Sequence, residues 1–170
     1  MHYSTRRAIF VTFLVSAAGV LGWFLFVYDW HASLPLAIFY ALLVLNTYPS
    51  VRLFSSLIPL EDGRHALADI MIAGVYFCLA ATLGNPAQFA LCATVLFLVA
   101  AAKYTLMLDE IPHPKLVERK VRIDLLGALM SAGVLAMMIF GWILVAGWTL
   151  AIIFALANLY VLALKPLYRL

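Results

Sequence analysis

Long apolar stretches alternate with short polar segments along the whole chain. A helix needs about 20 largely apolar residues to cross the hydrocarbon core of a bilayer. Six stretches meet this requirement, and they cover approximately residues 8–28, 33–52, 66–84, 87–108, 124–145 and 148–164. The pattern therefore predicts a polytopic membrane protein of the all-α class, in which six transmembrane helices form a single membrane-embedded bundle over residues 1–170.

The composition supports the same class. Hydrophobic residues make up 66% of the chain and charged residues 11%, and the mean hydropathy is +1.06. A soluble domain is close to half apolar and one quarter charged, and a disordered chain combines low hydrophobicity with high charge. The composition therefore excludes both a soluble globular protein and a disordered one.

The basic residues lie on alternate connections between the predicted spans. Three connections are short and carry no Lys or Arg, namely residues 29–32, 85–86 and 146–147. The eleven Lys and Arg residues instead flank the outer spans, fill the two longer loops or lie near the end of the fourth span, at Arg6, Arg7, Arg52, Arg64, Lys103, Lys115, Arg119, Lys120, Arg122, Lys165 and Arg169. Positively charged loops stay in the cytoplasm. This distribution predicts three hairpins in a cytoplasmic (inner) membrane, with both termini on the cytoplasmic side.

The net charge of +3 is then explained by topology. A basic cytoplasmic face is attracted to the anionic lipids of the inner leaflet. We therefore expect membrane lipids as partners, together with a protein partner or further copies of the same chain. No nucleic-acid partner is expected.

Five strongly polar residues of the spans gather near the predicted cytoplasmic ends, whereas the outer halves carry only weaker polar groups such as Thr82, Gln88 and Thr94. The five are Asn46, Asp69, Lys103, Asp124 and Asn158. Polar groups within a membrane are costly and commonly mark functional sites. Because Asp69 and Lys103 lie at similar depth on adjacent spans, we expect an ion pair between them. That pair could simply hold two helices together, Lys103 could instead extend to a lipid phosphate, or the pair could act in catalysis or transport.

Four residues could contribute to a metal site at the same face. His65 and Asp69 are four residues apart, and Asp109 and His113 lie in the next cytoplasmic loop. Carboxylates and imidazoles are common zinc ligands, but such groups beside Lys and Arg in a loop are usually solvated, so no metal site is predicted. All four histidines lie outside the spans or at their edges, so no haem and no other cofactor is expected.

Two local patterns predict packing. Small residues recur at a spacing of four, as in Ala18/Gly22 and Gly127/Ser131, which allows helices to approach closely in lipid. These pairs could build the bundle itself or an oligomer interface. Residues 51–60 have an amphipathic pattern that predicts a short interfacial helix, separated from the second span by a break at Pro49.

Three functions of different classes fit the sequence. The favoured one is a non-catalytic accessory or scaffold subunit that docks a partner through its basic cytoplasmic loops. The alternatives are an enzyme that acts on a lipid head group from the cytoplasmic side, suggested by the polar cluster, and a small transporter of an apolar or amphipathic solute. A hydrophilic solute would need a polar path through both halves of the membrane, and the outer halves of the spans lack one.

Overall fold

A computed structural model describes residues 3–57, 63–108, 114–164 and 167. The described chain is helical throughout, apart from short turns. Its elements are α1 (Tyr3–Phe26), α2 (Trp30–Leu57), α3 (Gly63–Ala81), α4 (Pro86–Leu106), α5 (Pro114–Ile139), α6 (Ile143–Leu159) and a π-helical turn, η1 (Tyr160–Leu164).

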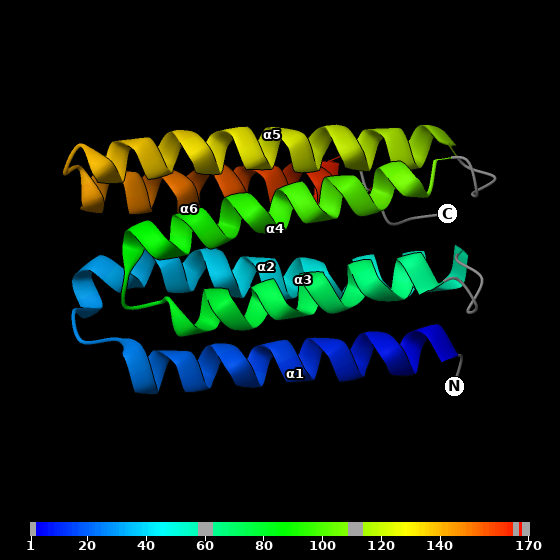
Figure 1. The fold of residues 1–170 in the computed structure, drawn as a ribbon, viewed down its shortest axis with the longest axis horizontal. Helices are drawn as coiled ribbons and strands as arrows, with labels where there is room; N and C mark the ends of the chain where they lie inside the picture. Colours follow the sequence, from blue (N-terminus) through cyan, green and yellow to red (C-terminus); the bar gives the residue numbers. More distant parts are fainter. Residues whose placement is uncertain (1–2, 58–62, 109–113, 165–166, 168–170) are drawn as a thin grey trace.

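The helices lie side by side, and consecutive helices run in opposite directions (Figure 1). They form a closed ring in which α1 packs on α2, α2 on α6, α6 on α5, α5 on α4, α4 on α3, and α3 on α1. Helix α1 begins and α6 with η1 ends towards one end of this bundle, which we call the terminus end (Figure 1). The opposite end, the turn end, carries the short connections α1–α2, α3–α4 and α5–α6.

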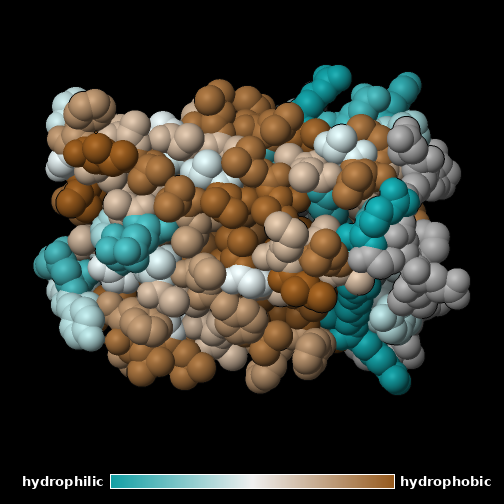
Figure 2. All heavy atoms as spheres, in the orientation of Figure 1, coloured by the Kyte–Doolittle hydropathy of each residue, from teal (hydrophilic) through white to brown (hydrophobic). Residues whose placement is uncertain are grey.

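In the described part of the chain, six helices are long and apolar enough to cross a membrane. Large apolar side chains also cover the outside of the bundle, for example Phe13 and Phe24 of α1, which are 72% and 79% exposed. Figure 2 shows apolar side chains over the middle of the visible face, with hydrophilic ones towards the ends, above all the terminus end. Such a surface is stable in lipid and unstable in water. The protein is therefore a multi-pass integral membrane protein.

Close helix packing dominates the core near the turn end. A Cβ added to Gly22 of α1 would overlap the backbone of Ala80 in α3, and one added to Gly84 would overlap the backbone carbonyl of Phe26. Aromatic rings complete this core, with Phe39 and Phe89 in an edge-to-face contact at 5.7 Å between centroids. The small residue Gly22 thus serves contacts within this bundle.

The fifth span begins and ends earlier than predicted, and the sixth begins earlier but ends at Leu164 as predicted. We expected the turn at residues 146–147, but α5 ends at Ile139 and α6 begins at Ile143. The turn uses Gly141, whose φ of +90° is a conformation that favours glycine. Gly147 is instead buried in α6, where an added Cβ would lie 3.0 Å from the Pro35 ring of α2. Its small size serves helix packing and not a turn.

The expected break at Pro49 is also wrong. Helix α2 continues through Pro35 and Pro49 to Leu57. Proline is tolerated within membrane helices because neighbouring groups satisfy the freed backbone atoms. The continuous helix carries Ser50 and Phe54 to the same interior face as the residues before the proline.

Candidate functional site

A cavity of about 180 Å³ lies inside the ring of helices, between its middle and the terminus end. All six helices contribute to its lining, and we call it the polar chamber. Its polar lining consists of Arg7, Asn46, Thr47, Ser50, Ser55, Asp69, Tyr76, Lys103, Tyr104, Lys120, Asp124 and Asn158. Apolar side chains close the part nearest the middle of the bundle, among them Leu43, Leu96, Phe97 and Phe154.

Asp69 of α3 forms ion pairs with two cations in the chamber wall. Lys103 of α4 donates to its Oδ1 atom, which confirms the ion pair expected from the sequence. Arg7 of α1 donates from Nη2 to the other carboxylate oxygen at 2.8 Å. The carboxylate side chain is 31% exposed and that of Lys103 only 8%. Asp69 therefore links α1, α3 and α4, and balances the charge of a buried lysine.

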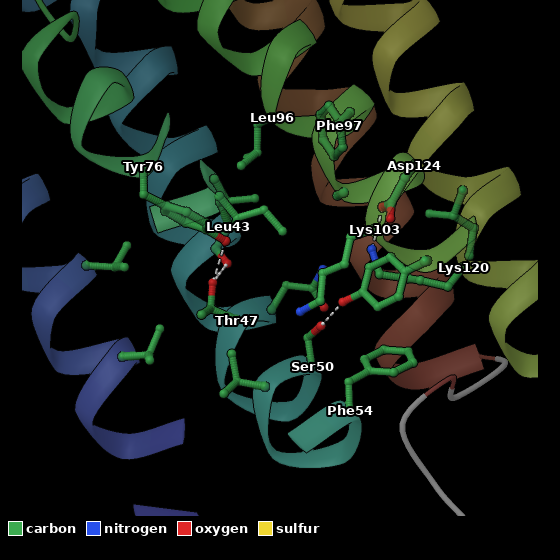
Figure 3. Close-up of a pocket in the computed structure, with 18 of the residues that line it drawn as sticks. Leu43, Thr47, Ser50, Phe54, Tyr76, Leu96, Phe97, Lys103, Lys120 and Asp124 are labelled. Carbon is green, nitrogen blue, oxygen red and sulfur yellow. Dashed lines mark hydrogen bonds and ion pairs between the residues drawn. The ribbon is translucent and has the colours of Figure 1, made fainter. Parts of the chain in front are cut away.

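A second ion pair lies on α5, where Lys120 Nζ donates to Asp124 Oδ1 one helical turn later. Both side chains are buried, and they point towards each other in Figure 3. The pair exists because α5 begins at Pro114, ten residues before the predicted start of that span. The hydropathy pattern predicts a loop at Lys120. Its spacing of four from Asp124 was the signal that could have identified the pair.

The ring of Tyr104 lies close to both ion-paired lysines of the chamber, Lys103 and Lys120. Lys120 Nζ is 5.0 Å and Lys103 Nζ 5.7 Å from the ring centroid, both within the range of cation–π attraction. The Tyr104 hydroxyl also forms a hydrogen bond with Ser50 of α2 at 3.2 Å. Tyr104 thus connects both ion-paired lysines to α2.

A shorter hydrogen bond joins α2 to α3. The hydroxyl groups of Thr47 and Tyr76 are 2.6 Å apart, and the two side chains point towards each other in Figure 3. Thr47 also donates to the backbone carbonyl of Leu43 at 2.8 Å, so Tyr76 donates to Thr47. Sequence reasoning missed these hydroxyl groups because threonine and tyrosine are common in apolar spans.

Three acceptor atoms in the chamber wall have no hydrogen-bond partner among the described residues: Asn46 Oδ1, Asp124 Oδ2 and Asn158 Oδ1. Asn158 Nδ2 donates to the carbonyl of Phe154 at 2.9 Å, which fixes the orientation of this amide. Asp124 is 1% exposed and Asn158 6%. A buried acceptor without a donor costs about 1–3 kcal/mol. A ligand that donates a hydrogen bond to one of these atoms would therefore gain binding energy.

The structure places all five residues of the predicted polar cluster in the chamber lining, namely Asn46, Asp69, Lys103, Asp124 and Asn158. Their action as a functional site stays a prediction. No local pattern marks Arg7 as a chamber residue, because its place in the lining depends on the packing of α1 against α3.

The residues considered as metal ligands do not form a cluster in the described structure. Asp69 is engaged by two cations, and His65 is buried outside the chamber lining. Within the described ranges, no group of three or more His, Cys, Asp or Glu side chains could hold a metal ion. Asp109 and His113 lie outside the described residues.

The chamber has three cationic and two anionic side chains, and so a formal net charge of +1. Every cation has a carboxylate partner at hydrogen-bond distance. A neutral polar group could therefore enter the chamber without changing its formal charge of +1.

Comparisons with models of protein families, with curated proteins and with solved structures gave no significant match.

Proposed function

We propose that the protein lies in a cytoplasmic (inner) membrane with both termini on the cytoplasmic side, and that the polar chamber binds the head group of an amphipathic molecule. The orientation is supported by the basic residues, which the sequence concentrates on the connections at the terminus end. The chamber would then lie at the depth of the inner leaflet, where a lipid presents its head group.

The observation that carries this proposal is the buried ionic lining of the chamber. Lys120 and Asp124 are 7% and 1% exposed, inside a helix that is long and apolar enough to cross the membrane. A buried ion pair contributes little stability compared with apolar residues of similar volume. Ionisable groups within membrane helices are therefore retained mainly for function. A structural role alone would be served as well by apolar side chains.

The apolar half of the bundle favours recognition from one side. Towards the turn end the interior is filled by tightly buried side chains such as Leu36, Leu79 and Phe89. A pathway for a hydrophilic solute needs polar groups through both halves. This arrangement supports binding at one leaflet over conduction of a hydrophilic solute. Head-group chemistry and the movement of an amphipathic solute both begin with such binding.

The test compares the wild type with the double variant Lys120→Met/Asp124→Leu, which exchanges the buried pair for apolar side chains. Both proteins are purified in mild detergent, and their bound lipids are measured by mass spectrometry. We expect the wild type to retain a defined amphipathic molecule and the double variant to lose it while keeping its thermal stability. Equal lipid content in two equally stable proteins would contradict the proposal.

A second candidate function is that of an accessory subunit, favoured by the exposed basic start of α5. Lys115 and Arg122 are exposed there, outside the chamber. The side chain of Arg122 is 79% exposed and lies 3.8 Å from Glu118. Such a surface suits a protein partner or a further copy of the chain.

The variant Lys115→Gln/Arg122→Gln tests this second candidate because it leaves Lys120 in place. An accessory subunit would lose its co-purifying partner or its oligomeric state in this variant, while lipid binding in the chamber would be unchanged. Retention of the same protein partners would argue against docking through this surface.

A further inference from the structure

We infer that the chamber selects a neutral head group that carries hydroxyls, such as a glycerol or a sugar, through Asp124 Oδ2 and Asn158 Oδ1. This inference rests on the proposed function, since it specifies the chemical class of the molecule that enters the chamber. It starts from the atoms of the chamber wall that still require hydrogen bonds.

Asp124 and Asn158 both present an acceptor. Lys120 occupies Oδ1 of Asp124, and Oδ2 has no partner in the described part of the chain. The amide nitrogen of Asn158 donates to the backbone carbonyl of Phe154 in its own helix. The amide oxygen, Oδ1, has no hydrogen-bond partner among the described residues. An ionised carboxylate and an amide oxygen can only accept hydrogen bonds. A ligand that satisfies them must therefore be a donor.

The chamber's charge disfavours a cationic head group, and its unpartnered acceptors disfavour a fully ionised phosphate. A phosphate has only acceptors to offer when fully ionised, and it would compete with Asp69 for Arg7 and Lys103. An ammonium group would be a donor, but the lining already has a formal charge of +1. A hydroxyl both donates and accepts and carries no charge. Hydroxyl groups therefore match the chamber best.

The dimensions of the chamber agree with this class. An engineered apolar cavity of about 150 Å³ holds a benzene ring, so a cavity of about 180 Å³ has room for one sugar ring or a glycerol unit. Leu96, Phe97 and Phe154 form the apolar part of the lining and would contact the first carbons of an acyl chain.

The backbone next to Asn158 supports a binding role for this wall. The α-helix ends at Leu159, and the chain continues as the π-helical turn η1, in which Val161 lines the chamber. Short π-helical segments occur frequently at functional sites. The change of helix type sets the direction of the chain just after the proposed hydrogen-bonding residue.

The experiment measures binding to the full-length protein in phosphatidylcholine nanodiscs by native mass spectrometry. One lipid is added at a time: diacylglycerol, monoglucosyl-diacylglycerol, phosphatidic acid or phosphatidylethanolamine. Free glycerol and free glucose are tested separately, to distinguish a lipid head group from a soluble polyol.

We expect the two neutral hydroxyl-bearing lipids to bind preferentially, and the variant Asn158→Leu to bind them roughly ten-fold more weakly, since about one hydrogen bond is lost. The matched control is Thr149→Val, because among the described residues this hydroxyl donates to Val145 of its own helix, and it lies outside the chamber. The control should bind as the wild type does. If Asn158→Leu does not fold, Asn158→Gln, which displaces the amide oxygen, replaces it in the comparison.

The other outcomes separate the inference from the proposed function. Preferential binding of phosphatidic acid or phosphatidylethanolamine would overturn the hydroxyl selectivity and leave head-group binding intact. Binding of free glycerol or glucose as tight as that of the lipids, with the same loss in Asn158→Leu, would support the hydroxyl chemistry and overturn the lipid as its source. Absence of selective binding to any probe would overturn both.

Discussion

The terminus end and the turn end of the bundle are held together by different interactions. At the turn end, the backbones of α1 and α3 are in contact, because Gly22 of α1 has no side chain to hold it away from Ala80 of α3. At the terminus end, the same two helices are joined by the side chains of Arg7 and Asp69 around a cavity. Close packing fills one half of the molecule, and ion pairs surround a space in the other.

Under the proposed function, this difference corresponds to a division between a half that stabilises the fold and a half that binds the ligand. In lipid, helices associate through packing of small residues, which acts wherever backbones can approach. An interior of buried charges gains little stability over an apolar one. We therefore expect changes at the turn end to affect stability alone, and balanced changes at the terminus end to affect ligand binding alone.

The largest effect is expected when one member of the buried Lys120–Asp124 pair is removed. Asp124→Leu leaves a buried lysine without its carboxylate and should lower the free energy of unfolding by about 3–5 kcal/mol. Lys120→Met/Asp124→Leu should recover most of this loss without recovering bound lipid. Denaturant titration in mixed micelles measures both variants. A double variant as unstable as the single one would show that the pair itself stabilises the fold.

The next effect is expected at the turn end. A Cβ at position 22 would overlap the Ala80 backbone, so Gly22→Ala should force α1 and α3 apart and cost about 1–3 kcal/mol. Gly74→Ala on α3 is the control, because no described atom of another helix lies within 4 Å of its added Cβ. Thermal unfolding should separate the two variants. Equal melting temperatures would refute the close approach of the helices, and lipid loss in Gly22→Ala at low temperature would break the division between the halves.

A smaller effect is expected for Asp69→Asn. The change removes the charge that Arg7 and Lys103 share and leaves the buried Lys103 with only an amide acceptor. Because the Asp69 side chain is 31% exposed, water can solvate part of this site, so we expect a cost of about 1–2 kcal/mol, below that of Asp124→Leu. Salt should reduce this difference because it screens exposed charges. Denaturant unfolding of the wild type and of Asp69→Asn at low and high ionic strength measures this difference in the free energy of unfolding. A loss as large as that for Asp124→Leu would make the two ion pairs equivalent.

The smallest effect is expected outside the chamber. Arg122 and Glu118 are both exposed and 3.8 Å apart, so Arg122→Gln should change the free energy of unfolding by less than about 0.5 kcal/mol. Its lipid content, measured by mass spectrometry, should equal that of the wild type. A loss of lipid in this variant would mean that binding depends on the basic surface and not on the chamber.

Much of the fold could be predicted from the sequence because the length of an apolar stretch is set by the thickness of the bilayer. The boundaries were less predictable where one residue type serves two purposes. Gly147 was interpreted as a turn residue, but it packs against Pro35, and the turn itself uses Gly141. Helix α5 extends from the apolar stretch into a basic segment, which no hydropathy pattern marks.

The chamber was partly predictable for a similar reason. Costly polar residues within the spans, such as Asp69 and Asn158, stand out against their apolar neighbours. Arg7 and Lys120 do not, because basic residues beside a span are expected for topology alone. Their place in the chamber depends on which helices are neighbours in the ring, and that order comes from side-chain packing far apart in the sequence.

Site-specific photo-crosslinking tests ligand binding in the chamber most directly, by comparing it with the outer surface of the bundle. A diazirine analogue of leucine is placed at Leu96, in the chamber wall, or at Leu21, which is 59% exposed on the outer face of α1. After illumination in native membranes, the attached lipids are identified by mass spectrometry. We expect position 96 to capture one lipid class, enriched over its share of the membrane, and position 21 to capture lipids in bulk proportions. The same lipid mixture at both positions, or no lipid at position 96, would contradict a ligand-binding role for the chamber.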